Sequence, residues 1–86
     1  MTESPEARQK RMRMRSWRRG TKEMDLILGP YADVNLGQMG DAELEEYDAL
    51  LSENDQDLYE WVTARAAPPD RFTSLIGKIA HFAKSR

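Results

Sequence analysis

The clearest structural pattern in the chain is the stretch DRFTSLIGKIAHFA, which occupies residues 70–83. Its apolar side chains recur at intervals of three and four residues, the spacing that places them on one face of an α-helix. They are Phe72, Leu75, Ile76, Ile79, Phe82 and Ala83. Asp70 follows Pro68-Pro69 and stands where a helix N-cap is expected. The stretch therefore predicts a capped, amphipathic last helix that packs on a core.

Two helices are predicted in the N-terminal part. Ser4-Pro5-Glu6 combines a capping hydroxyl with a proline at the first helical position, so a first helix should run to about Ser16. Its many arginines leave only four side chains to be buried, Ala7, Met12, Met14 and Trp17. A second helix begins near Gly20 or Thr21 and has a core-facing stripe of Met24, Ile27, Leu28 and Tyr31. We expect a kink or a break at Gly29-Pro30, because proline lacks the amide hydrogen.

Two more helices complete the expected fold. The third should occupy about residues 41–51 and bury Leu44, Tyr47, Leu50 and Leu51. Asn54 is the expected cap of a short fourth helix, which buries Leu58, Trp61 and Val62. No stretch alternates apolar and polar residues as a strand does. The chain is therefore predicted to be all-α, a compact bundle of five short helices in one domain over residues 1–86, with residues 1–6 and 84–86 frayed.

The composition limits what the chain can do. A chain of 86 residues has room for one modest core, so a deep catalytic pocket is not expected. The absence of cysteine excludes disulfides and thiolate metal sites and indicates a reducing compartment. No stretch approaches the roughly 20 apolar residues that cross a bilayer, and no secretory signal follows the basic start. We expect a soluble protein of the bacterial cytoplasm, with no membrane insertion.

Charge is segregated along the chain although the net charge is only -2. Residues 1–22 hold eight Lys or Arg against two Glu, and residues 23–70 hold thirteen Asp or Glu against Arg65 alone. Residues 71–86 are basic again. Either the two ends fold back on the acidic middle and neutralise it, or the molecule has a bipolar surface that steers a partner. The pattern alone leaves both interpretations open.

Residues for catalysis and metal binding are sparse. His81 is the single histidine and lies beside the apolar stripe of the last helix, which favours a packing or surface role. No zinc-type ligand spacing and no glycine-rich phosphate loop are present. The acidic residues between 43 and 57 lack the glycine of an EF-hand loop and are interpreted as a solvated face. We expect no enzymatic activity, no metal and no stably bound cofactor.

The arginine-rich N-terminus with Trp17 suggests an alternative function. Basic residues next to an aromatic ring can contact phosphates and stack on a base. A small regulatory or nucleic-acid-binding protein that uses the basic N-terminal helix is therefore the alternative. Against it, the chain has a sequence pI near 5.4, so most of its surface would repel a duplex.

The remaining candidate site is the segment from Trp17 and Arg18 through Arg19-Gly20-Thr21-Lys22-Glu23-Met24-Asp25. In one interpretation it is only a helix corner, where the glycine makes the turn, the acids complement the dipole of the second helix and the arginines pair with them. In the other, a glycine corner lets a partner approach the backbone while an arginine and an acid stand exposed beside it.

This segment resembles the signature of the SdhE-type FAD assembly factors, called succinate dehydrogenase assembly factor 2 in mitochondria. The signature is Arg-Gly-x-x-Glu with an Asp two residues later, and Arg19, Gly20, Glu23 and Asp25 match it. The resemblance continues in Leu26-Ile27-Leu28, in the acidic stretch from Glu43-Leu44 to Leu51 and in Asp55-Gln56-Asp57-Leu58-Tyr59-Glu60-Trp61, and it covers about residues 8–80.

The resemblance implies a function as well as a five-helix bundle. A member of this family would bind the flavoprotein subunit of succinate dehydrogenase, and in some bacteria fumarate reductase, and promote covalent attachment of FAD to it. The client would carry the flavin chemistry, and the assembly factor, a monomer when free, would hold the client. The implied partner-binding residues are Arg19, Gly20, Glu23 and Asp25, with Trp17 and Arg18 beside them.

Overall fold

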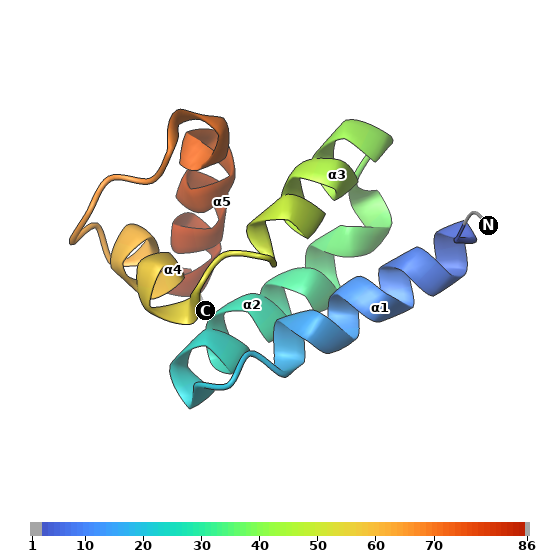
Figure 1. Ribbon diagram of the computed structural model, residues 1–86, viewed down its shortest axis with the longest axis horizontal. Coiled ribbons are helices and arrows are strands. Elements are labelled where there is room, and N and C mark those ends of the chain that lie inside the picture. Colours follow the sequence, from blue (N-terminus) through green and yellow to red (C-terminus); the bar gives the residue numbers. More distant parts are fainter. Residues whose placement is uncertain (1–2, 86) are drawn as a thin grey trace.

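The computed structural model describes residues 3–85. It contains five α-helices, α1 (Pro5–Trp17), α2 (Lys22–Asn35), α3 (Asp41–Leu50), α4 (Asp55–Val62) and α5 (Thr73–Lys84), and short 3-10 turns at Leu36–Gln38 and Asp70–Phe72. The predicted all-α bundle of five short helices is confirmed, and no strand occurs within the described residues. Helices α1 and α2 form an antiparallel hairpin, with α3 near one end of it and α4 and α5 near the other (Figure 1).

Helix α2 lies at the centre of the packing, because it contacts α1, α4 and α5. The predicted stripe faces the core: Met24, Leu28 and Tyr31 are buried, and Ile27 packs against them from the edge. The inward residues predicted for α3 are all buried, and so are Leu58 and Val62 of α4. The last helix supplies Leu75, Ile76 and Ile79, and Phe72 precedes it.

Two of the three predicted helix caps are present, and Thr21 provides a further cap that was not predicted. The Ser4 hydroxyl accepts a hydrogen bond from the Ala7 amide at 3.1 Å, and Thr21 accepts one from Met24 at 3.3 Å. The side-chain oxygen of Asn54, Oδ1, accepts hydrogen bonds from the amides of Gln56 and Asp57 in the first turn of α4. The cap expected at Asp70 is wrong: the chain makes a 3-10 turn there, no side chain caps it, and α5 begins three residues later.

Of the kink or break expected at Gly29-Pro30, the break is wrong, because α2 continues through both residues. A proline inside a helix costs about 3 kcal/mol. On both sides of it, Leu28, Tyr31 and Ala32 are buried, and each large apolar side chain contributes about 2 kcal/mol on burial. The Trp17 ring also packs on Gly29, where an added Cβ would lie only 2.3 Å from a ring carbon. Tertiary packing therefore outweighs the local cost of the proline.

Helix α1 buries fewer apolar residues than expected. Met12 is buried, but Ala7 is exposed, Met14 is 44% exposed and Trp17 is 37% exposed. Ser16 is buried instead, and its hydroxyl donates to the Met12 carbonyl at 2.8 Å and lies 2.6 Å from the Tyr47 hydroxyl. This pairing satisfies both hydroxyls, which otherwise would be costly to bury. Burial also raises the pKa of Tyr47.

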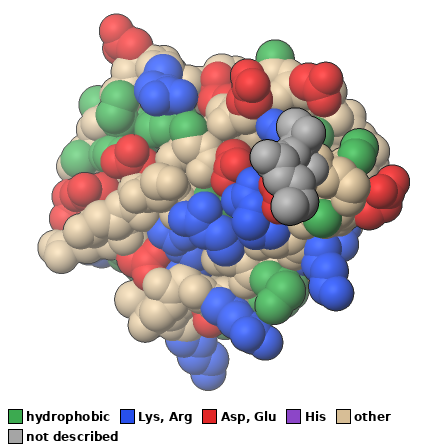
Figure 2. All heavy atoms as spheres, turned by 45° about the vertical axis from the view of Figure 1, so that its right-hand side comes forward, with side chains coloured by type: hydrophobic (Ala, Val, Ile, Leu, Met, Phe, Trp, Pro, Cys, Tyr) green, Lys and Arg blue, Asp and Glu red, His purple; other side chains and the backbone are tan. Residues whose placement is uncertain are grey.

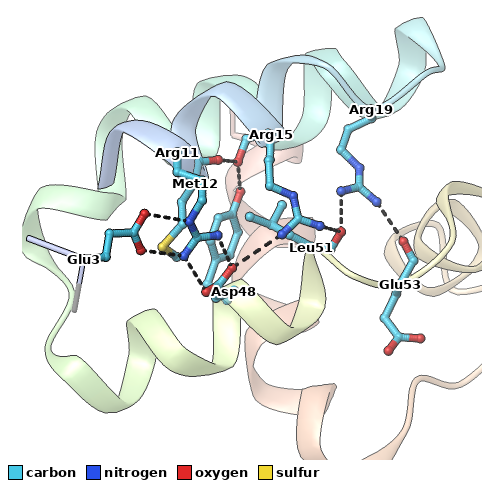
Figure 3. A network of polar contacts seen from close by, with 10 residues as sticks. Glu3, Arg11, Met12, Arg15, Arg19, Asp48, Leu51 and Glu53 are labelled. Atoms are coloured by element: carbon cyan, nitrogen blue, oxygen red, sulfur yellow. Dashed lines mark hydrogen bonds and ion pairs between the residues drawn. The ribbon is translucent and has the colours of Figure 1, made fainter. Parts of the chain in front are cut away.

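A row of three arginines joins α1 to α3. Arg11, Arg15 and Arg19 are spaced four residues apart and point to the same side of α1 (Figure 3). Arg11 donates two hydrogen bonds of 2.8 Å to Asp48 and two more to Glu3, while Arg15 donates to the Leu51 carbonyl at 2.9 Å. The bidentate bond from Arg11 holds the pKa of Asp48 below its ordinary value.

These contacts bear on whether the basic ends of the chain neutralise its acidic middle. Basic residues of the N-terminal segment do neutralise acids of the middle, and Lys78 of the last helix lies 3.7 Å from Glu43. Figure 2 shows Lys and Arg side chains gathered across the middle of one face with acidic side chains around them. The fold therefore depends on charge pairing between segments as well as on its core.

Two other expectations concern the ends and the membrane. The fraying expected at residues 1–6 and 84–86 falls partly on residues 1, 2 and 86, which lie outside the described residues; Pro5 begins α1 and Lys84 ends α5. None of the helices between residues 3 and 85 combines the length and the apolar character that a bilayer crossing requires.

Two glycines test the packing of the hairpin. Gly29→Ala should lower the free energy of unfolding by about 1–3 kcal/mol, because the new methyl group overpacks against Trp17. Gly77→Ala is the matched control, since Gly77 is an exposed helical position with open space around it, and it should stabilise by about 0.5–1 kcal/mol. Urea unfolding of the two variants measures both values, and equal effects would contradict the close helix approach.

Asp48 makes the stability depend on pH. Its pKa is lowered in the folded state, so its stabilisation is present above the unfolded pKa of about 3.9 and is lost as the pH falls through the lower folded value. Asp48→Asn should therefore be less stable than the wild type at pH 7 and should lose less stability on acidification. Unfolding at pH 7 and at about pH 3 measures the difference, with the exposed Glu45→Gln as control.

Candidate functional site

Arg19 forms the support of the site. Its side chain is only 8% exposed, and its guanidinium donates to Asp55 Oδ1 at 2.8 Å, to the Leu51 carbonyl at 2.6 Å and to the Glu53 carbonyl at 2.7 Å. Figure 3 shows the last two bonds, which reach the chain just after α3. Carbonyls at a helix C-terminus carry partial negative charge and have no partner within the helix. Arg19 therefore fastens the α1–α2 corner to the loop between α3 and α4.

Gly20 makes the corner itself. Its φ of +105° lies in the region that L side chains rarely adopt, so glycine is required there for the turn. The Arg19 amide donates to Asp25 Oδ1 at 2.6 Å, which fixes the corner from the side of α2. A Cβ at Gly20 would stand 3.5 Å from Asp55 Oδ2, so the corner also lies against the start of α4.

A groove of about 320 Å³ opens beside this corner, between the start of α2 and α4. It is lined by Thr21, Glu23, Asp55, Gln56 and Tyr59. Glu23 is exposed, and its carboxylate has no hydrogen-bond or ion-pair partner among residues 3–85. The arginine pairing expected for Glu23 is absent there because Arg19 turns inward to Asp55. The groove therefore presents an available carboxylate beside a fixed glycine corner.

The structure separates the six predicted site residues into three places. Glu23 lines the groove, while Arg19, Gly20 and Asp25 build the corner. Trp17 and Arg18 lie away from the groove: the Trp17 indole donates to Asp33 at 3.2 Å, and Arg18 is exposed. The predicted residues thus surround one helix corner without forming one cluster.

Sequence reasoning missed three residues of the groove that belong to α4, Asp55, Gln56 and Tyr59. Asp55 and Tyr59 stand four positions apart and Gln56 and Tyr59 three, the spacings of one helix face. The signal was present in the stretch from Asp55 to Trp61, which the resemblance singled out, but that stretch does not indicate which of its faces meets α2. The Arg19–Asp55 ion pair sets that orientation, and it joins residues 36 positions apart.

Arg19 can be tested as the support of the corner. Arg19→Lys keeps a positive charge but cannot reach Asp55 and two carbonyls together, so it should lower the free energy of unfolding by about 2–4 kcal/mol. Arg18→Lys changes the neighbouring, exposed arginine and should stay within about 0.5 kcal/mol of the wild type. Chemical denaturation of both variants gives the comparison, and a stable Arg19→Lys protein would rule out the supporting role.

Comparison with known proteins finds a matching family and several similar proteins. Residues 10–83 match the family described as "Flavinator of succinate dehydrogenase". The chain is 36% identical over 91 residues to the mitochondrial succinate dehydrogenase assembly factor 2 of Candida glabrata, which covers 100% of this chain and 60% of that protein. The identity is 37% over 83 residues to the protein of that name from Mycosarcoma maydis, covering 93% of this chain and 35% of that protein.

A third relative has the same name. The chain is 31% identical over 77 residues to the succinate dehydrogenase assembly factor 2 of Dictyostelium discoideum, and it covers 55% of that protein. The chain thus spans between 35% and 60% of the length of these curated relatives.

The relatives correct one expectation and establish the family. All three are named as mitochondrial proteins, so the expected location in a bacterial cytoplasm is wrong: the relatives point to the mitochondrion. The match over residues 10–83 includes the corner, the groove and all five helices in whole or in part. The chain therefore belongs to the family of flavinators of succinate dehydrogenase.

Proposed function

We propose that this protein is an assembly factor that binds the flavoprotein subunit of succinate dehydrogenase and promotes covalent attachment of FAD to it. Family membership supports the proposal, and so do the printed names of the relatives. The observation that carries it is the exposed Glu23 carboxylate, which stands in a groove beside a corner that Arg19 holds rigid. A docking point that is fixed before the partner arrives loses little conformational entropy on binding.

In this proposal the motif residues have different roles. Glu23 contacts the client, and Gly20 lets the client approach the backbone because it has no side chain. Arg19 and Asp25 act as positioning residues, since their polar atoms bind the corner and the α3–α4 loop. Gln56 and Tyr59 extend the contact from the other wall of the groove.

The protein is proposed to hold its client and not to perform chemistry. The groove offers carboxylates and the hydroxyls of Thr21 and Tyr59, but the Thr21 oxygen accepts the capping hydrogen bond of Met24, and no base among residues 3–85 orients either hydroxyl. FAD carries an anionic pyrophosphate, which the exposed Glu23 carboxylate would repel. The flavin therefore stays with the client, whose own residues carry the attachment chemistry. We also propose fumarate reductase as a second client, and a monomer as the form of the free protein.

The nucleic-acid alternative loses part of its support. It relied on the N-terminal arginines, but Arg11, Arg15 and Arg19 are engaged with carboxylates and carbonyls inside the molecule. Phosphate binding requires cations that are available for it. We therefore favour a protein client.

Two variants test the proposal in cells that lack the gene. Glu23→Ala should weaken client binding by about 1–2 kcal/mol, and Gly20→Arg should block docking because a bulky side chain is forced into a conformation at φ +105°. The measurement is flavin fluorescence that stays with the flavoprotein subunit on a denaturing gel. Glu45→Ala, an exposed acid of α3, is the matched control and should restore flavin attachment fully.

The outcome is clear if folding is measured in parallel. Circular dichroism at the growth temperature shows whether each variant is folded, which matters most for the strained Gly20→Arg. Full restoration of bound flavin by folded Glu23→Ala and Gly20→Arg would contradict the proposal.

A further inference from the structure

Helix α1 and its C-cap carry a second row of side chains that contains two basic residues not used by the fold. This row has four-residue spacing and is exposed, and it consists of Lys10, Met14 and Arg18. Trp17 stands three residues after Met14. Arg11, Arg15 and Arg19 of the neighbouring stripe are all bound to acids or carbonyls. In the described part of the chain, by contrast, Lys10 and Arg18 have no hydrogen-bond or ion-pair partner through their side chains. We call Lys10, Met14, Trp17 and Arg18 the hairpin face.

Trp17 is held in place within this face. Its ring lies on Gly29 of α2, and its Nε1 donates to both oxygens of Asp33 at 3.2 Å. Arg13 Nε lies 3.4 Å from the same carboxylate. The indole is nevertheless 37% exposed, beside Met14 at 44%. A large aromatic side chain that is already ordered and still exposed has the properties of a binding hot spot.

The composition of the hairpin face favours a protein partner. Trp, Met and Arg are enriched at the centres of protein interfaces. A lipid bilayer or a nucleic acid presents a dense array of phosphates, whereas this face offers only two unpaired cations, Lys10 and Arg18, beside exposed apolar side chains. The unpaired charges, Lys10 and Arg18, are both positive, so the complementary surface is acidic.

The position of the hairpin face links it to the docking corner. Arg18 is the C-cap of α1 and precedes Gly20 by two residues, so the face begins where the corner ends. One partner seated on the corner can therefore extend over it. We infer that the hairpin face is a second contact area, which takes an acidic segment of the flavoprotein subunit around an apolar centre; this inference rests on the proposed function.

The experiment measures association of this protein with the purified flavoprotein subunit of succinate dehydrogenase lacking covalent flavin. Lys10→Glu and Arg18→Glu should each lower the association rate about tenfold at low ionic strength, because a reversed charge opposes an acidic surface. The difference should fade in about 1 M salt, where screening is strong. Lys84→Glu is the control: it changes the net charge equally, at an exposed position at the end of α5.

A further variant tests the apolar centre. Met14→Ser removes exposed apolar surface without touching the core and should raise the dissociation rate at all salt concentrations. Unchanged rates for Lys10→Glu and Arg18→Glu, with wild-type binding intact and weakened by Glu23→Ala, would overturn the second contact area but leave the proposed function standing. No binding by the wild-type protein would overturn the proposed function itself. Equal wild-type affinity for phosphatidylserine vesicles or RNA would also overturn the inference.

Discussion

The guanidinium of Arg19 is the interaction on which the rest of the arrangement depends. It binds the carbonyls of Leu51 and Glu53, just beyond the end of α3, and the carboxylate of Asp55, the first residue of α4. It therefore holds the α1–α2 corner, α3 and α4 together at one point. A single planar group with several donors can do this, whereas a lysine ammonium can serve such a set only loosely. The groove exists because the Arg19–Asp55 ion pair fixes the start of α4 against the corner. Its shape is therefore a consequence of a buried charge and not of the apolar core.

The sequence predicted the helices well wherever burial follows a local period. The stripes of α2, α3 and α5 are visible in the spacing of their apolar residues, and burial of those residues decides where helices form. The failures occur where a distant residue decides. Trp17 stabilises α2 at Gly29, and Asp48, which is 37 positions from Arg11, orients α1. Such contacts leave no trace in local periodicity.

The site was predicted as a region but not as a set of roles. The match to a family motif led to the corner as a binding site, although spacing alone favoured a purely structural helix corner. Only the structure distinguishes Arg19, turned inward, from Glu23, which faces the groove. Tyr59 was missed because its position opposite α2 follows from a tertiary ion pair. A sequence motif therefore identifies residues that are close in the chain, but residues elsewhere in the fold decide which of them are accessible to a partner.

The two tryptophans occupy different environments, and this has a practical consequence. Trp61 packs against Phe72 at a ring distance of 6.2 Å beside the core, whereas Trp17 lies partly in water on Gly29 and next to the Asp33 carboxylate. Indole emission depends on the polarity and charge around the ring. The molecule therefore carries two intrinsic optical reporters, one for the integrity of its interior and one for events on the outside of the α1–α2 hairpin, without any added label.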